Sequence, residues 1–227
     1  MIRGLLLDFY GTVVEDDETI MDTIAGRVAA GASAPVTARE VAAAWNREYE
    51  AEADLTPFRT LRQSARGGLA TVMAQVGYAG DPVEVLCAPQ FAYWRSPPLR
   101  PGTGEFLSRV TVPICLVSDA DRADLRAATA HHGLTFDAVV SSEDVGAYKP
   151  DRLMFTRALT ELGLATDEVL HVGDSLAHDV RGAAAAGIRA VWVNRRGGEL
   201  PPDVPVAYEI ADLAALPALL DDLGGQG

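Results

Sequence analysis

Short apolar runs recur along the chain, and several of them end in a polar residue. The first spans residues 2–9 (IRGLLLDF), a nearly continuous hydrophobic stretch that closes on an acid. Further runs follow at 112–119, 138–142, 169–174 and 190–194. Short runs that are apolar at nearly every position, without strict alternation, predict strands that are buried on both faces of a parallel sheet.

Helical patterns fill the intervals between the later runs, at 122–132, 152–162 and 176–187. Strands that alternate with helices of this length are typical of an α/β, doubly wound fold. Ligands of such folds bind at the carboxyl ends of the parallel strands. The pattern therefore predicts both the fold class and the edge of the sheet at which a site should lie.

About 100 residues separate the first strand from the second, which is too long for one crossover. Three helices are predicted there, at 36–55, 57–77 and 82–96, and the first begins with a Thr37–Glu40 capping box. We therefore expect a helical cap at 15–96, inserted into a core formed by 1–14 and 97–227. The alternative, that these helices simply pack on the sheet, stays open.

Composition narrows the class of protein. The chain has 227 residues, 48% of them hydrophobic, which is enough for one core carrying an insertion. Its formal net charge of −13 argues against nucleic acid or an anionic membrane as a partner. No apolar run approaches a spanning helix, and the N-terminus does not resemble a signal peptide, so we expect a cytoplasmic protein. A homodimer stays open, and Cys87 and Cys115 are expected to be buried thiols.

Polar groups stand at the predicted strand ends, where a doubly wound sheet keeps its site. Asp8 ends the first strand, Ser118 and Asp119 end the second, and Asp174 ends a later one, with Asp179 one helical turn beyond; Lys149, the only lysine of the chain, precedes a helix. Each of these alone could be a helix cap or a surface charge. Together they offer a carboxylate nucleophile, a lysine to balance it and acids for a cation. Acids brought this close need a counter-charge, and Mg²⁺ prefers oxygen ligands of this kind.

Four segments in this order, LDFYGT, LVSD, YKP and VGDSLAHDVRGA, resemble the four motifs of the haloacid dehalogenase superfamily. The resemblance covers the whole chain and implies a Rossmann-like core with a helical cap inserted after the first motif. It also implies hydrolase chemistry in which Asp8 attacks the substrate.

The resemblance further implies roles by position. The transferring group would be bound by Ser118, by Lys149 and by backbone amides near Gly11 and Asp119. Thr12 would support the first loop, and Asp179 would position Lys149 or the water shell of the metal. Mg²⁺ would be held by Asp8, by Asp174 and by the backbone carbonyl of Tyr10.

Tyr10 departs from the phosphatase pattern, which resembles DxDGT and uses the second acid as a general acid and base. Loss of such a group typically costs roughly 10²- to 10⁴-fold in rate. DxYGT instead resembles the 2-haloacid dehalogenases, in which a halide leaves without a proton. Against that alternative, Asp174 keeps the magnesium acid, whereas those enzymes resemble SSNxxD there and need no metal.

The cap sequence adds a second argument. The substrate arginine of the dehalogenases follows a cap tryptophan, whereas Asn46 follows Trp45 here, although Arg39 or Arg47 could substitute. The cap also contains no lysine, which disfavours phosphonatase chemistry. We therefore expect a Mg²⁺-dependent phosphatase of a small phosphorylated metabolite, with a 2-haloacid dehalogenase and a catalytically altered binding protein as alternatives. The acids at 15–18, a good leaving group or a substrate group could replace the missing acid.

Overall fold

The computed structural model describes residues 1–53 and 57–224. It divides into two compact units. The first comprises Met1–Asp16, Pro98–Asp119 and His132–Gly227, and the second comprises Asp17–Pro97 and Ala120–His131. The predicted division at 14/15 and 96/97 stays a prediction, and the short segment after the second strand belongs with the inserted helices.

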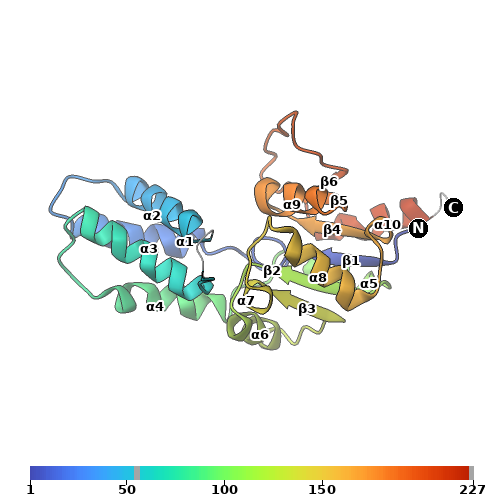
Figure 1. Cartoon of the computed structure of the whole chain (residues 1–227), viewed down its shortest axis with the longest axis horizontal. Coiled ribbons are helices and arrows are strands. Elements are labelled where there is room, and N and C mark those ends of the chain that lie inside the picture. Colours follow the sequence, from blue (N-terminus) through green and yellow to red (C-terminus); the bar gives the residue numbers. More distant parts are fainter. Residues whose placement is uncertain (54–56, 225–227) are drawn as a thin grey trace. The chain divides into compact units, whose positions relative to one another are not determined.

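A six-stranded parallel sheet forms the centre of the first unit (Figure 1). Its strands are β1 (Gly4–Leu7), β2 (Ile114–Ser118), β3 (Ala138–Ser141), β4 (Val169–Gly173), β5 (Arg189–Val193) and β6 (Tyr208–Ile210), in the order β3-β2-β1-β4-β5-β6. All five predicted strands are confirmed, and β6 was missed. Every residue of β1, β2 and β4 is buried, as the continuous apolar runs require. The α/β, Rossmann-like fold class is thus confirmed.

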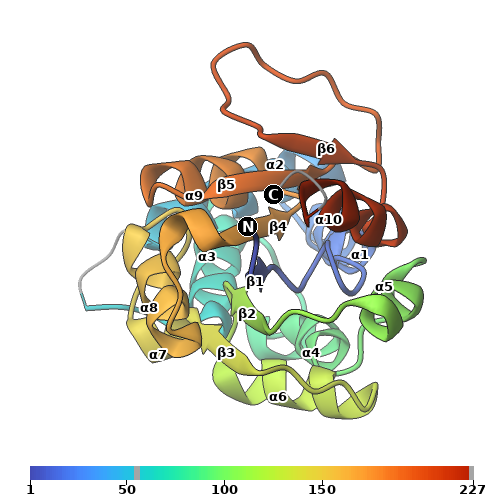
Figure 2. The same cartoon turned by 90° about the vertical axis from the view of Figure 1, so that its right-hand side faces the viewer.

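Helices cover both faces of this sheet (Figure 2). They are α5 (Thr103–Arg109), α7 (Ser142–Val145), α8 (Arg152–Leu162), α9 (Arg181–Ala185) and α10 (Leu216–Gly224), with short turns η1 (Thr166–Glu168), η2 (Leu176–Val180) and η3 (Leu213–Ala215). The predicted helix at 176–187 is divided into the π-helical turn η2 and the α-helix α9. Side chains of α8 and α9 pack with strand residues in one buried cluster, which fixes these helices on one face.

The second unit is helical. It contains α1 (Glu18–Ala30), α2 (Ala38–Ala53), α3 (Leu61–Gln75), α4 (Val83–Trp94) and α6 (Arg122–His131). The Thr37–Glu40 capping box is confirmed, since each residue's backbone N–H donates to the other's side chain. The predicted end of the helix at 36–55 falls on residues that lie outside the described part of the chain, residues 54–56. Sequence reasoning missed α1, whose first residue, Glu18, is the last of the acids at 15–18.

The strand order creates a switch point beside β1. The chain runs from β1 outward to β2 and β3, and then returns to the other side of β1 to form β4. At such a point the connections leave in opposite directions, so a crevice opens beyond the carboxyl ends of the two strands. Asp8 follows β1 and Asp174 follows β4. The topology therefore brings these two acids to the place where this fold binds ligands.

Candidate active site

Asp8 is fixed by the strand that it follows and by the turn that it opens. Its backbone N–H donates to the Val172 carbonyl at 2.9 Å, which extends the pairing of β1 with β4 by one residue. The next residues close a tight turn, because the Val13 and Val14 N–H groups both donate to the Phe9 carbonyl. Asp8 is buried as a result, with 5% of the residue exposed.

Gly11 allows this turn to approach Asp174. Its φ of +89° lies in the left-handed region, and a Cβ at this position would lie 2.7 Å from Asp174 Oδ2. Any side chain here would therefore strain the backbone and displace the carboxylate. Gly11 acts through the space that it leaves beside Asp174.

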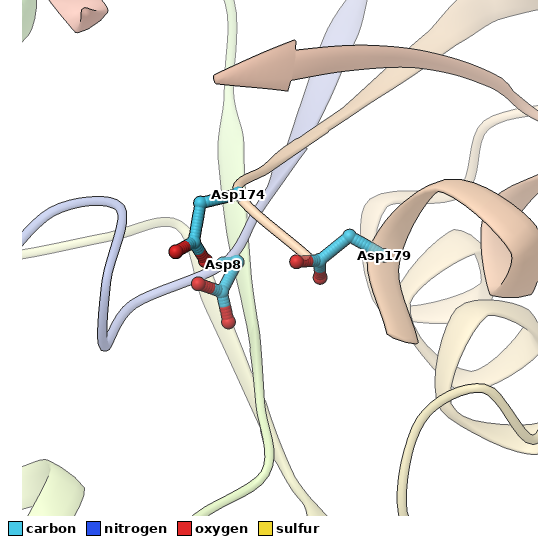
Figure 3. Close-up of side chains that lie close together, drawn as sticks. All are labelled: Asp8, Asp174 and Asp179. Carbon is cyan, nitrogen blue, oxygen red and sulfur yellow. The ribbon is translucent and has the colours of Figure 1, made fainter. Parts of the chain in front are cut away.

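Three carboxylates converge at the switch point (Figure 3). Oxygen atoms of Asp8, Asp174 and Asp179 lie within 4.8 Å of one another. Asp179 reaches the site because η2 starts immediately after β4: Ser175 caps this turn by accepting the His178 N–H at 3.1 Å, and its own N–H donates to Asp179 Oδ2 at 3.0 Å. The structure thus gives Ser175 a capping role.

Lys149 links two of these acids. Its Nζ lies 2.6 Å from Asp8 Oδ1 and 2.7 Å from Asp179 Oδ1, and the residue is 5% exposed. Its backbone N–H donates to Asp119 Oδ1 at 2.8 Å, which ties the end of β2 to the same lysine. The alternative reading of Lys149 as a solvated surface charge is wrong.

His171 was missed by sequence reasoning. It lies in the middle of β4, is fully buried, and its Nε2 is 2.9 Å from Asp179 Oδ1. The signal was a histidine inside the apolar run VLHVG, where a hydrophobic residue is the usual choice.

Burial and mutual charge set the protonation of the group. Burial raises the pKa of Asp8, and burial together with the Asp8 charge raises the pKa of Asp174 to about 7. Burial also acts to raise the pKa of Asp179, but Lys149 and His171 outweigh it and hold that pKa below its ordinary range. Burial alone would lower the pKa of Lys149, yet the surrounding acids hold it well above its ordinary value.

These contacts separate the acids that could hold a cation from the one that could not. Both oxygens of Asp179 already accept from protein groups, namely Lys149, His171 and the Ser175 N–H. Within the described residues, Asp8 Oδ2 is buried without a hydrogen-bond partner, and the nearest cation to the Asp174 carboxylate is Arg195, at 3.7 Å. The oxygens that remain available therefore belong to Asp8 and Asp174, the pair that suits a hard divalent ion.

The other predicted residues lie around this centre. Thr12 is 1% exposed, and its hydroxyl acts to lower the pKa of Asp8. Ser118 is buried at the end of β2, paired in register with Ser141. Tyr10 is partly buried and packs edge-on against Phe9, with ring centroids 5.1 Å apart. Its position in the Asp8 turn is as predicted, while its role stays a prediction.

The acids at 15–18 have structural partners. In the first unit, Glu15 pairs with Arg100 at 2.7 Å, and Asp16 lies 3.5 Å from Arg195. In the second unit, Asp17 Oδ2 accepts hydrogen bonds from Gln90 and Trp94, at 2.8 and 2.7 Å. Glu18 starts α1. None of these contacts points to a proton donor that replaces the acid missing at Tyr10.

The fold and the site together define a Rossmann-like α/β protein with a carboxylate and lysine centre at its switch point. The family model of haloacid dehalogenase-like hydrolases matches residues 2–187. The chain belongs to this family, and it is therefore a hydrolase of the haloacid dehalogenase superfamily.

The similar proteins include both a phosphatase and 2-haloacid dehalogenases. A phosphoserine phosphatase of Thermus thermophilus is 36% identical in an alignment that covers 62% of this chain and 59% of that protein. An (S)-2-haloacid dehalogenase of Pseudomonas sp. is 26% identical in an alignment that covers 99% of this chain and 97% of that protein. The structure of L-2-haloacid dehalogenase from Xanthobacter autotrophicus is similar with a TM-score of 0.74, at 22% identity over 97% of this chain and 99% of that one.

Proposed function

We propose that this protein is a Mg²⁺-dependent phosphatase that hydrolyses a small phosphorylated metabolite through an aspartyl-phosphate on Asp8. The observation that carries the proposal is the placement of Asp174 beside Asp8. The pKa of Asp174 is raised to about 7, and Gly11 keeps the space next to its carboxylate open. A site that worked without a cation would gain nothing from a second acid there, whereas a divalent ion would remove the repulsion.

Asp8 and Asp174 would hold Mg²⁺, which would neutralise part of the charge on the transferring phosphoryl group. The chain's own residues account for the remaining steps. An Asp8 oxygen attacks phosphorus, and the P–O bond to the leaving group breaks. Lys149, held by Asp179, balances negative charge beside Asp8. Water then attacks the aspartyl-phosphate, which releases phosphate and restores the Asp8 carboxylate.

Tyr10 limits the substrates that such a site can use. A tyrosine in place of the second acid leaves no carboxylic acid in the Asp8 turn to protonate the departing oxygen. Substrates with acidic leaving groups, or with a group of their own that donates the proton, should therefore react fastest. We propose further that the helical second unit is the cap and that it sets this selectivity. We expect the protein to bind a small phosphorylated metabolite and not a nucleic acid.

A 2-haloacid dehalogenase is the second candidate. Tyr10 in the first motif favours it, as does the (S)-2-haloacid dehalogenase that matches nearly the whole chain. In that reaction Asp8 attacks carbon, halide leaves without a proton, and water hydrolyses the ester. Arg39 or Arg47 would then have to bind the substrate carboxylate.

One experiment separates the two. Phosphate release from a panel of phosphorylated metabolites is measured with Mg²⁺ and with EDTA, beside halide release from 2-chloropropionate. Mg²⁺-dependent phosphate release that is lost in Asp8→Asn supports the phosphatase. Halide release that is unaffected by EDTA would overturn it in favour of the dehalogenase, and activity that survives Asp8→Asn would overturn both mechanisms.

A further inference from the structure

His171 is an unusual residue for the fully buried interior of a strand. It is fully buried in β4, and Phe155 packs edge-on against its ring with centroids 5.0 Å apart. Its Nδ1 has no hydrogen-bond partner within the described residues. An apolar side chain would fill this position without burying an unpaired nitrogen, so the imidazole does not serve packing alone.

The contact of the other ring nitrogen, Nε2, explains why a histidine stands at this position. Nε2 lies 2.9 Å from Asp179 Oδ1, the same oxygen that lies 2.7 Å from Lys149 Nζ. An ionised carboxylate only accepts hydrogen bonds, so Nε2 must carry the hydrogen. Asp179 is thus held from two sides, by His171 from the sheet and by Lys149 from the site.

Lys149 depends on that arrangement. Its ammonium spans Asp179 Oδ1 and Asp8 Oδ1, at 2.7 and 2.6 Å. A lysine side chain has several rotatable bonds, so a fixed second carboxylate is needed to keep it on Asp8. We propose that His171 is a positioning residue, which orients Asp179 and through it holds Lys149 against the nucleophile. The inference rests on Asp8 being the nucleophile, which the phosphatase and the dehalogenase share.

Three variants test this role. His171→Phe keeps an aromatic ring but removes the donor, and His171→Gln can place an amide N–H near the position of Nε2. Phe155→Leu is the matched control, because Phe155 touches the same ring without contacting the acids through a polar group. We expect His171→Phe to lower kcat roughly 10- to 100-fold with KM within about twofold, since outer contacts of this kind have effects of that size. His171→Gln should recover most of the loss, and Phe155→Leu should retain kcat within about threefold.

A double-mutant cycle with Asp179→Asn separates positioning from packing. If His171 acts through Asp179, His171→Phe should lower kcat less than twofold further once Asp179 is replaced. A merely structural histidine would give the same fold-loss in both backgrounds, which would overturn the inference. A His171→Phe variant that folds and keeps wild-type kcat would overturn it as well.

Nitrogen-15 NMR of the imidazole gives a readout that needs no substrate. The expected result is a hydrogen on Nε2, a bare Nδ1, and a shift of the Nε2–H resonance in Asp179→Asn. A hydrogen on Nδ1 with Nε2 bare would overturn the contact, even if His171→Phe failed to fold. If the wild type releases neither phosphate nor halide, the proposed function fails, and the NMR result still decides the link between His171 and Asp179.

Discussion

Substitution of Tyr10 provides the most direct test of the proposed phosphatase activity. It occupies the turn that follows Asp8, two positions after the proposed nucleophile, where a carboxylic acid could protonate a departing oxygen. Tyr10→Asp should therefore raise kcat for alkyl phosphates, which have poor leaving groups, by roughly 10- to 100-fold. For aryl phosphates, whose leaving groups need little help, the gain should be small.

Tyr10→Asn is the matched control for that experiment. It has the size of aspartate but cannot exchange a proton, so its rates should stay near those of the wild type. Equal gains in the Asp and Asn variants would mean that removal of the tyrosine ring, and not the new acid, caused the change. Phosphate release under single-turnover and steady-state conditions distinguishes these outcomes.

Gly11 leaves no room for a side chain beside Asp174. An alanine Cβ would lie 2.7 Å from Asp174 Oδ2, at a φ of +89°. Gly11→Ala should therefore lower both stability and Mg²⁺ affinity. Gly187→Ala is the control, because Gly187 has a φ of +79° but open space around it, so this variant carries the backbone strain alone, about 1–2 kcal/mol. Isothermal titration with Mg²⁺ should show weaker binding only in Gly11→Ala, and equal affinities would contradict the proposed role of the Gly11 space.

The buried strands could be predicted from the sequence because the positions of a central parallel strand are mostly apolar. β1, β2 and β4 are apolar at nearly every position, and their ends place Asp8 and Asp174 beside each other. β6 could not be read in this way, since it has three residues and one of them is Glu209. His171 escaped for a related reason: its role depends on a contact with η2, which no periodicity reports.

The start of α3 shows a contact that no local pattern predicts. Thr60 and Gln63 form a capping box, which the sequence can suggest. Asp121, far away in the chain, also accepts hydrogen bonds from the backbone N–H groups of Leu61 and Arg62, at 2.6 and 3.2 Å. A carboxylate is favourable there because the N–H groups of a helix start lack helical partners. This contact ties the segment before α6 to the inserted helices within the second unit.

Asp121→Ala should destabilise the protein by about 1–2 kcal/mol, the usual cost of losing a helix cap. At this chain length, the melting temperature should fall by about 2–4 °C for each kcal/mol. Asp22→Ala, which removes an exposed acid of α1, should leave the melting temperature within about 1 °C. Equal melting temperatures for the two variants would show that the Asp121 contact contributes nothing to stability.

The protein as a whole is strongly acidic, and three of its acids, Asp8, Asp174 and Asp179, lie together in the candidate site. The formal net charge is −13, yet the described site acids are paired with specific cations, Lys149 on Asp8 and Arg195 near Asp174. Within residues 1–53 and 57–224, no helix has both the length and the apolar character to cross a bilayer. An anionic substrate must therefore be held by local groups against the overall charge of the protein, which is the task that we assign to Lys149 and to a bound cation.

Without a bound cation, the stability of the protein should depend on the protonation of Asp174. In the folded protein the pKa of Asp174 is about 7, above its ordinary value of 3.8. Between these two values the folded state binds a proton that the unfolded state does not, so the stability of the metal-free protein falls as pH rises from about 4 to 7. Asparagine at position 174 does not titrate, so the Asp174→Asn variant should not show this pH-dependent loss of stability. In EDTA, we therefore expect the variant to melt above the wild type at pH 8 and close to it near pH 4.

Mg²⁺ should reverse that order. A cation that binds only the folded state raises the melting temperature with its concentration, and it needs the Asp174 carboxylate to do so. At pH 8 the wild type should therefore gain stability as Mg²⁺ is added, while Asp174→Asn should not respond. Melting curves that run parallel across pH in EDTA would contradict the raised pKa. Another outcome is that the curves diverge in EDTA while the melting temperature of the wild type does not change with Mg²⁺. Burial of the Asp174 carboxylate would then destabilise the protein without a cation to compensate for it, and the site would favour chemistry without a metal.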